Sequence, residues 1–227
     1  MKMEILDNIP VLIKTDEVMN ILHLGNESRY IEVVNEFIEK IQPIIRPKAI
    51  YDVKFVEHVD KDAIELDGVR FVSKVLRVNL ENIGRVFPYV ATSGIEAESI
   101  GKDEDDLMSK FIIDTIKEIA LRSAINYLYN YIKGRYKIKQ MSSMNPGSLE
   151  DWPISEQKPL FSIFGDVEKL IGVKLTDSFL MIPIKSVSGI YFPTESSFAS
   201  CQLCPREKCP NRRAKYDPEL KEKYMKD

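Results

Sequence analysis

Several kinds of residue and segment are scarce or missing in this chain, and each absence narrows the function. No stretch approaches the roughly 18–20 apolar residues that a membrane-spanning helix requires. Residues 1–10 also lack the basic stretch followed by an apolar stretch that marks a signal peptide. The net charge of −3 provides no overall attraction toward nucleic acid or an anionic membrane. We therefore expect a cytoplasmic protein that binds neither nucleic acid nor membrane.

Cysteine is rare, and all of it lies in one place. The three cysteines are Cys201, Cys204 and Cys209, in a Cys-x2-Cys-x4-Cys arrangement near the C-terminus. In a cytoplasmic protein, such a clustered, odd-numbered set favours metal or redox chemistry over structural disulfides. The spacing does not match the Cys-x3-Cys-x2-Cys pattern of radical S-adenosylmethionine enzymes, and the second cysteine pair of a zinc ribbon is missing.

Three interpretations of these cysteines stay open. A third cysteine followed by proline is typical of ferredoxin ligand runs, so the thiolates could hold a 4Fe-4S cluster with a non-cysteine ligand on the remaining iron. Zinc, with an Asp, a His or water as its fourth ligand, is the second interpretation. A tail with unligated thiols is the third.

The remaining composition is that of a globular protein, with 44% hydrophobic and 30% charged residues. Residues 50–59 alternate in the manner of a half-buried strand, Asp67-Gly68 predicts a hairpin turn, and residues 86–92 predict a further strand. A long apolar pattern predicts a largely buried helix over 103–133, capped by Asp103 and closed by Gly134. Further strands are expected at 179–182 and 187–192.

This order of elements predicts an α+β fold: a single domain with a largely antiparallel twisted sheet, a long buried helix and a Cys-rich C-terminal tail. We expect the domain to span residues 1–198 and the tail residues 199–227. Asp114 falls in the middle of the apolar helix, so we expect a buried carboxylate that needs a hydrogen-bonding partner.

Six short segments carry a resemblance to a known family. They are Ala-Thr-Ser-Gly-Ile-Glu at 91–96 with Phe-Ile-Ile-Asp-Thr-Ile at 111–116, Asn-Pro-Gly at 145–147 with Asp-Trp-Pro at 151–153, Leu-Thr-Asp-Ser-Phe-Leu-Met-x-Pro at 175–183, and Ser-Val-Ser-Gly-Ile-Tyr-Phe at 186–192. Together they resemble the S-adenosylmethionine-binding reactivation domain of cobalamin-dependent methionine synthases, here as a stand-alone version. The resemblance covers residues 86–198.

The resemblance implies an accessory function with no catalytic side chain of its own. Such a domain binds S-adenosylmethionine and docks over the cobalamin of a corrinoid-binding methyltransferase, so that the methyl donor meets the metal. The expected partner is a methionine synthase that lacks its own reactivation domain, and the second choice is an anaerobic corrinoid methyltransferase. An electron donor such as flavodoxin or ferredoxin is also implied. The cofactor-binding residues we assign on this basis are Asp114, Arg122, Asn145, Pro146, Gly147, Ser186, Ser188, Gly189 and Phe198.

Three positions depart from the family pattern. The family's loop carries Arg and Tyr where this chain has Ser143 and Ser148, and the long helix carries Glu in many members where this chain has Arg122. The missing Arg would bind the carboxylate of the ligand's methionine part, a role that Arg122 or Lys139 could take over. These departures favour an alternative function. In it the chain is a module that docks on a corrinoid protein, either delivering electrons or only binding, and does not bind S-adenosylmethionine.

The corrinoid is expected on another chain, because neither His23 nor His58 fits the Asp-x-His-x-x-Gly pattern of a corrinoid-carrying domain. The cysteines directly follow the segment expected near the ligand. This position favours an iron–sulfur centre that passes an electron to the partner's cobalt.

Overall fold

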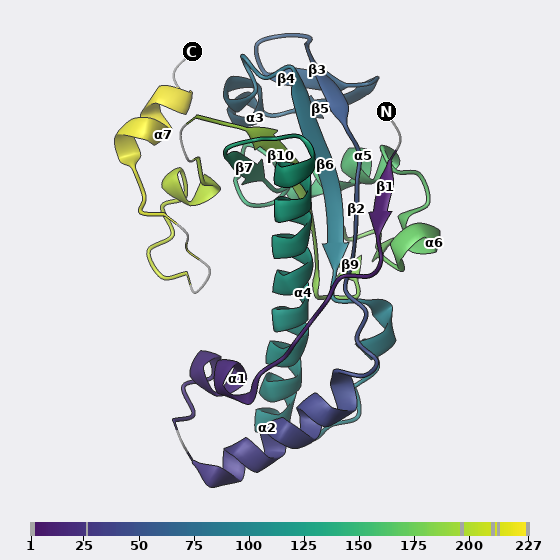
Figure 1. The fold of residues 1–227 in the computed structure, drawn as a ribbon. Helices are drawn as coiled ribbons and strands as arrows, with labels where there is room; N and C mark the ends of the chain where they lie inside the picture. Colours follow the sequence, from purple (N-terminus) through teal and green to yellow (C-terminus); the bar gives the residue numbers. More distant parts are fainter. Residues whose placement is uncertain (1–2, 26, 196–197, 210–211, 213, 226–227) are drawn as a thin grey trace.

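The computed structural model describes residues 3–25, 27–195, 198–209, 212 and 214–225, which form one α+β domain (Figure 1). The main sheet of the described chain is antiparallel throughout. Its strands are β1 (Glu4–Leu6), β2 (Lys48–Tyr51), β3 (Lys54–His58), β4 (Ala63–Leu66), β5 (Val69–Val72), β6 (Arg85–Thr92), β7 (Met141–Met144) and β10 (Ser186–Pro193). The strand pairing runs β7-β10-β6-β2-β1, and β3, β4 and β5 extend the sheet from the other end of β6. The predicted fold class is confirmed.

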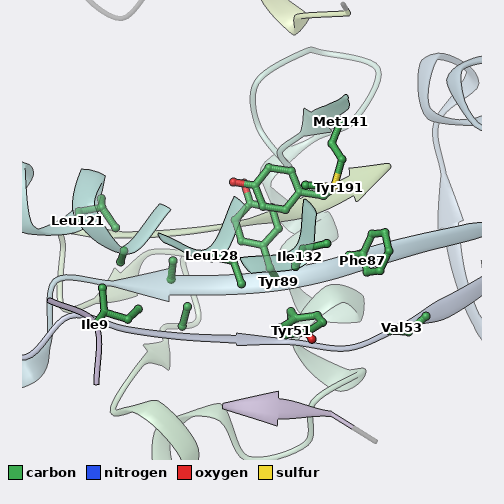
Figure 2. Packing of buried hydrophobic residues seen from close by; sticks show 13 residues of the cluster. Ile9, Tyr51, Val53, Phe87, Tyr89, Leu121, Leu128, Ile132, Met141 and Tyr191 are labelled. Carbon is green, nitrogen blue, oxygen red and sulfur yellow. The ribbon is translucent and has the colours of Figure 1, made fainter. Parts of the chain in front are cut away.

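Helix α4 (Leu107–Arg135) is the predicted long helix, and it lies against one face of the sheet (Figures 1 and 2). Leu121, Ala124, Leu128 and Ile132 of α4 pack on Tyr89 and Tyr191 of neighbouring strands. These two tyrosine rings stack with centroids 4.2 Å apart. Because α4 and two adjacent strands share one apolar layer, the position of β10 is set by the helix as well as by its strand neighbours.

The ends of α4 differ from the prediction by a few residues. The N-cap is Asp106 rather than Asp103, and its carboxylate accepts a hydrogen bond of 2.7 Å from the backbone N–H of Ser109. At the other end the helix continues through Gly134 to Arg135. Asp103 lies too far upstream to reach the unpaired N–H groups of the first turn, which is the bonding that defines a cap.

Other helices complete the layers. Helices α1 (Thr15–Ile21) and α2 (Ser28–Ile41) pack around the first half of α4 through Val34, Ile41 and Ile116. The opposite face of the sheet is covered by α5 (Gln157–Ser162) and α6 (Val167–Ile171), where Phe161 and Val167 meet Ile50 and Val90. Helix α3 (Lys74–Asn79) joins the same side. A small hairpin, β8 (Lys174–Leu175) with β9 (Met181–Ile182), precedes β10.

Two predicted strands are shorter in the structure. The alternating segment 50–59 is divided between β2 and β3 at Asp52, whose Oδ1 accepts from the N–H of Val53 at 2.7 Å. Strand β9 begins only at Met181 because Phe179 takes a φ of 62° in a turn. In that turn the Thr176 hydroxyl oxygen accepts from the backbone N–H of Leu180 at 3.0 Å.

The C-terminal segment packs against the domain. Ala199 pairs with Ser143 of β7 in a parallel bridge, and Asp217 N–H donates to the Gln202 carbonyl at 2.8 Å. Helix α7 (Pro218–Met225) docks on α3, with the Tyr224 hydroxyl donating to Asn79 Oδ1 at 3.1 Å. No helix in the described ranges is long and apolar enough to cross a membrane.

Candidate functional site

Strand β10 carries three of the predicted cofactor-binding residues, and its start is tied to the end of β6. The Ser186 hydroxyl lies 2.9 Å from Thr92 Oγ1 and 2.7 Å from the carbonyl of Pro183. Ser93 N–H donates to the Lys185 carbonyl at 2.9 Å, and Gly94 N–H donates to Thr92 Oγ1 at 3.1 Å. These bonds hold the two strand ends in one arrangement, so Ser186 has a structural role there.

The predicted Pro-Gly loop is anchored to β10 by Asn145. The Asn145 side-chain amide donates to the Ser188 carbonyl at 2.8 Å and to the Tyr89 hydroxyl at 2.9 Å. A Cβ atom on Gly189 would come within 2.4 Å of Asn145 Nδ2 and 2.6 Å of the Met144 carbonyl oxygen. Only glycine therefore allows this approach of the loop to the strand.

The loop itself has a defined shape. Gly147 has a φ of 82°, and its N–H donates to the Trp152 carbonyl at 2.8 Å. The Ser148 hydroxyl donates to the Asn145 carbonyl at 2.6 Å, and Pro146 is buried. The structure thus brings together Asn145, Pro146, Gly147, Ser188 and Gly189, which the sequence separates by some forty positions.

Ser188 has one further property. Its side-chain oxygen is buried and has no hydrogen-bond partner in the described part of the chain, as is also true of Trp152 Nε1 and Gln157 Oε1. Buried polar groups are paired in most proteins, so such an atom indicates a place for water or a ligand atom.

Asp114 and Arg122 form a second group on the outward side of α4. The Asp114 side chain is 60% exposed, and its carboxylate pairs with the Lys185 ammonium at 2.9 Å. Lys185 also lies 3.4 Å from Glu118, and Glu118 pairs with Arg122 at 3.2 Å. The expectation that Asp114 is buried is wrong, because this position of α4 faces the loop before β10 instead of the sheet.

Phe198 lies beside the Pro-Gly segment through its backbone, and its ring points elsewhere. Its N–H donates to the Ser142 hydroxyl at 3.0 Å, while the ring lies 5.7 Å from that of Tyr224 in α7. The side chain therefore packs on the C-terminal helix.

The cysteines occupy a loop that begins at the edge of the sheet. Cys201 lies in a short 3-10 helix (Ser200–Gln202), and the Ser148 hydroxyl lies 3.4 Å from that of Ser200, so the cysteine loop adjoins the Pro-Gly loop. All three cysteines are thiols rather than disulfides. Within the described residues, no three His, Cys, Asp or Glu side chains converge as metal ligands.

Arg212 occupies the middle of this loop. Its guanidinium donates to the carbonyls of Cys201 at 3.1 Å, Ala214 at 3.1 Å and Cys204 at 3.2 Å, and also to that of Arg206. One cation therefore joins four carbonyl oxygens of the described part of the loop.

Two residues that take part in these contacts, Tyr89 and Lys185, were not predicted from the sequence. Tyr89 stands in an uninterrupted buried strand, where nothing marks one hydroxyl as the partner of a loop. Lys185 directly precedes Ser186, but its partners belong to a helix about seventy residues earlier, so no local pattern indicates the contact.

Two comparisons with known proteins bear on these groups. Residues 146–212 match the family described as vitamin B12 dependent methionine synthase, activation domain. This segment runs from the Pro-Gly loop to Arg212 and spans under a third of the chain. A search of the curated proteins finds no significant match.

Among solved structures, the chain is similar to one described as the MetH reactivation domain bound to AdoHcy. The TM-score is 0.60 with 16% sequence identity, over 88% of this chain and 81% of the other. The two findings confirm the predicted resemblance to this domain, and the structural match agrees with the α+β fold described above.

Proposed function

We propose that this chain belongs to the methionine synthase activation-domain family and helps to reactivate a corrinoid-dependent methyltransferase. The observation that carries the proposal is the Pro-Gly loop anchored on β10 by Asn145, which lies where the family match begins. The first partner we propose is a methionine synthase without a reactivation domain of its own. In this function the chain would hold the methyl donor in position against the partner's cobalamin and would supply no acid–base group.

We propose that S-adenosylmethionine binds at the surface formed by the Pro-Gly loop and the adjoining part of β10. When bound, this molecule supplies a methyl group to the partner's reduced cobalamin and leaves as S-adenosylhomocysteine. The N–H groups of Gly147 and Ser148 bond within the loop, so these two exposed residues would offer their carbonyl oxygens to a ligand. The space directly above Gly189 is filled by the Asn145 amide, so the ligand would lie outside that contact.

Binding of the methyl donor is tested by isothermal titration calorimetry of the full chain with S-adenosylmethionine up to millimolar concentration. We expect saturable binding that Asn145→Ala weakens at least tenfold, because the loop loses its anchor. Lys158→Met, an exposed change on α5, serves as the control and should bind like the wild type. Absence of heat and of any thermal shift at millimolar ligand would refute this part of the proposal.

A docking module that does not bind S-adenosylmethionine is the second candidate. Serine at positions 143 and 148 favours it, as does the pairing of Arg122 with Glu118, since this pair occupies the guanidinium that would otherwise meet a carboxylate. Sedimentation of the chain with a purified corrinoid protein separates the two functions. Complex formation without methyl-donor binding supports the module, and lack of any complex contradicts both candidates.

We further propose that the cysteine loop holds a metal centre that supplies the reducing electron. A 4Fe-4S cluster is the preferred centre, and zinc, which has no redox role, is the alternative. In the redox version, Cys201, Cys204 and Cys209 would hold the centre, which would supply one electron for the partner's cobalt, with an external donor such as flavodoxin or ferredoxin as the source of that electron. The nearness of the loop to the Pro-Gly loop supports this step. Since the described side chains do not converge on a metal, binding would require the loop to rearrange around Arg212.

Iron, sulfide and zinc are to be measured on protein purified without oxygen, together with its electron paramagnetic resonance spectrum after reduction. Stoichiometric iron and sulfide that disappear in Cys204→Ser would support the electron-transfer step. Stoichiometric zinc without iron would exclude it, and metal-free protein would leave the thiols without a metal role.

A further inference from the structure

A small cavity lies away from the Pro-Gly loop, between the first turns of α4, the turn at residues 98–102 and the loop before β10. Its volume is about 210 Å³. A water molecule's share of liquid volume is roughly 30 Å³, so the cavity can accept a group of several heavy atoms. Of its lining residues, only Asp114 was expected at the cofactor site, and the functions proposed above do not use the cavity.

Lysines dominate the lining of this cavity. Lys110 and Lys117 stand on one stripe of α4 with Asp114 between them, and Lys102 and Lys185 face them from the two loops. The lining carboxylates are Asp114 and Glu98. Four ammonium groups face two carboxylates in the lining, and Glu118, 3.4 Å from Lys185, adds a third carboxylate, so the surroundings of the cavity keep one positive charge in excess.

The four lysines differ in their ion pairs and hydrogen bonds. Lys185 pairs with Asp114 at 2.9 Å, and the Lys117 ammonium donates to the carbonyls of Ile100 at 2.8 Å and Glu98 at 3.4 Å. Across the described ranges, neither Lys102 nor Lys110 has a carboxylate within ion-pairing distance, so neither ammonium group is held in an ion pair.

Lys117 is partly buried in this lining. Burial lowers the pKa of its ammonium group, while the nearby carboxylates of Glu98 and Asp114 act in the opposite direction. A partly buried ammonium is less screened by solvent than a surface one, so it interacts more strongly with an anion that enters the cavity.

We propose that this cavity binds a small oxyanion with phosphate chemistry. Lysine binds phosphate as a point charge and needs no planar fork, whereas the cavity lining includes no arginine that would select a carboxylate by a bidentate contact. The excess of positive charge around the cavity favours such an anion. Ile184, 76% exposed at the rim, offers an apolar contact to whatever carries the phosphate.

The test uses inorganic phosphate as the probe and follows the amide signals of the full, isotope-labelled chain by NMR. We expect saturable shifts confined to residues 98–102, 110–117 and 184–185, with a dissociation constant in the millimolar range. Sodium chloride at the same ionic strength controls for screening, and sodium acetate separates phosphate from carboxylate recognition. The test needs no methyl donor, so its outcome does not depend on the function proposed above.

Variants locate the site. Lys110→Met should weaken phosphate binding about three- to fivefold, the effect of removing one solvent-exposed charge contact. Lys102→Met should do the same, and Lys158→Met on α5 should leave binding unchanged. Both test positions are exposed and outside the core, so the variants remain folded. Phenyl phosphate should bind more tightly than phosphate, and Ile184→Ser should remove that gain.

Equal NMR shifts in chloride and in phosphate would show charge screening only and would overturn the proposal. An equal loss of phosphate affinity in Lys110→Met and Lys158→Met would overturn it as well. Tighter binding of acetate than of phosphate would also overturn it.

Discussion

Replacing Gly189 by alanine tests the contact between the Pro-Gly loop and β10 directly. The new Cβ would lie 2.4 Å from Asn145 Nδ2, 2.6 Å from the Met144 carbonyl oxygen and 3.0 Å from the Tyr89 hydroxyl. Real Cβ atoms do not approach other atoms so closely, so the Asn145 side chain and the end of β7 must move. The two hydrogen bonds of the Asn145 amide, at 2.8 and 2.9 Å, are then broken or lengthened.

The size of the effect follows from these contacts. Each lost hydrogen bond contributes about 0.5–1.5 kcal/mol, and crowding in a packed interior costs about 1–3 kcal/mol. We therefore expect Gly189→Ala to lower the free energy of unfolding by about 2–6 kcal/mol, measured by urea denaturation. Gly134→Ala in α4 is the matched control, because its Cβ would meet nothing within 4 Å. It should stabilise the protein by about 0.5–1 kcal/mol.

A double-mutant cycle with Asn145→Ala assigns the crowding to its cause. The single Asn145 change should cost about 1–3 kcal/mol, and the double variant should be less destabilised than the sum by about 1 kcal/mol or more, since the new methyl group gains the space that the amide leaves. Strictly additive effects, or a Gly189→Ala protein within about 0.5 kcal/mol of the wild type, would refute the contact as described.

Two further predictions concern the ends of helices. A hydrogen bond from the Ser109 backbone N–H lowers the pKa of the Asp106 carboxyl below its usual 3.8. The cap therefore stabilises the fold above pH 3.8, and its contribution disappears as the pH falls through the lower folded-state pKa. Asp106→Asn should accordingly lower the urea midpoint at pH 7 and have a much smaller effect near pH 2; an equal difference at both pH values would contradict this assignment. Tyr224→Phe removes the hydrogen bond to Asn79 and should destabilise the docking of α7 by about 0.5–1.5 kcal/mol, seen as faster hydrogen exchange in α7; unchanged exchange, as expected for the control Tyr216→Phe, would show that this bond does not hold the helix.

Elements with strong local signals could be predicted from the sequence. The hairpin at Asp67-Gly68 joins β4 and β5 as expected, and the apolar pattern of α4 gave its type and length to within a few residues at each end. The strands around 86–92 and 187–192 were also recognised, because long apolar runs between turn residues leave few other structures. Weakly patterned segments were missed: β7 reads Met-Ser-Ser-Met, and α3 has only six residues.

The candidate site likewise has residues that the sequence indicated and contacts that only the structure shows. Its glycine, proline and serine residues stood out in the sequence, since those residue types mark turns and close approaches wherever they occur. The sequence could not show that Asn145 fills the space above Gly189, or that Arg212 binds the carbonyls of the cysteine loop.

The amino-acid sequence by itself determined the fold class, the long helix and the segments that resemble the activation domain, because periodicity and turn chemistry act over a few residues. Only the tertiary structure decided that Asp114 faces solvent and pairs with Lys185, and that four lysines surround one cavity. The physical reason is that each of these contacts joins residues far apart in the chain. Their direction depends on how α4 is rotated against the sheet and on where the loop before β10 meets it.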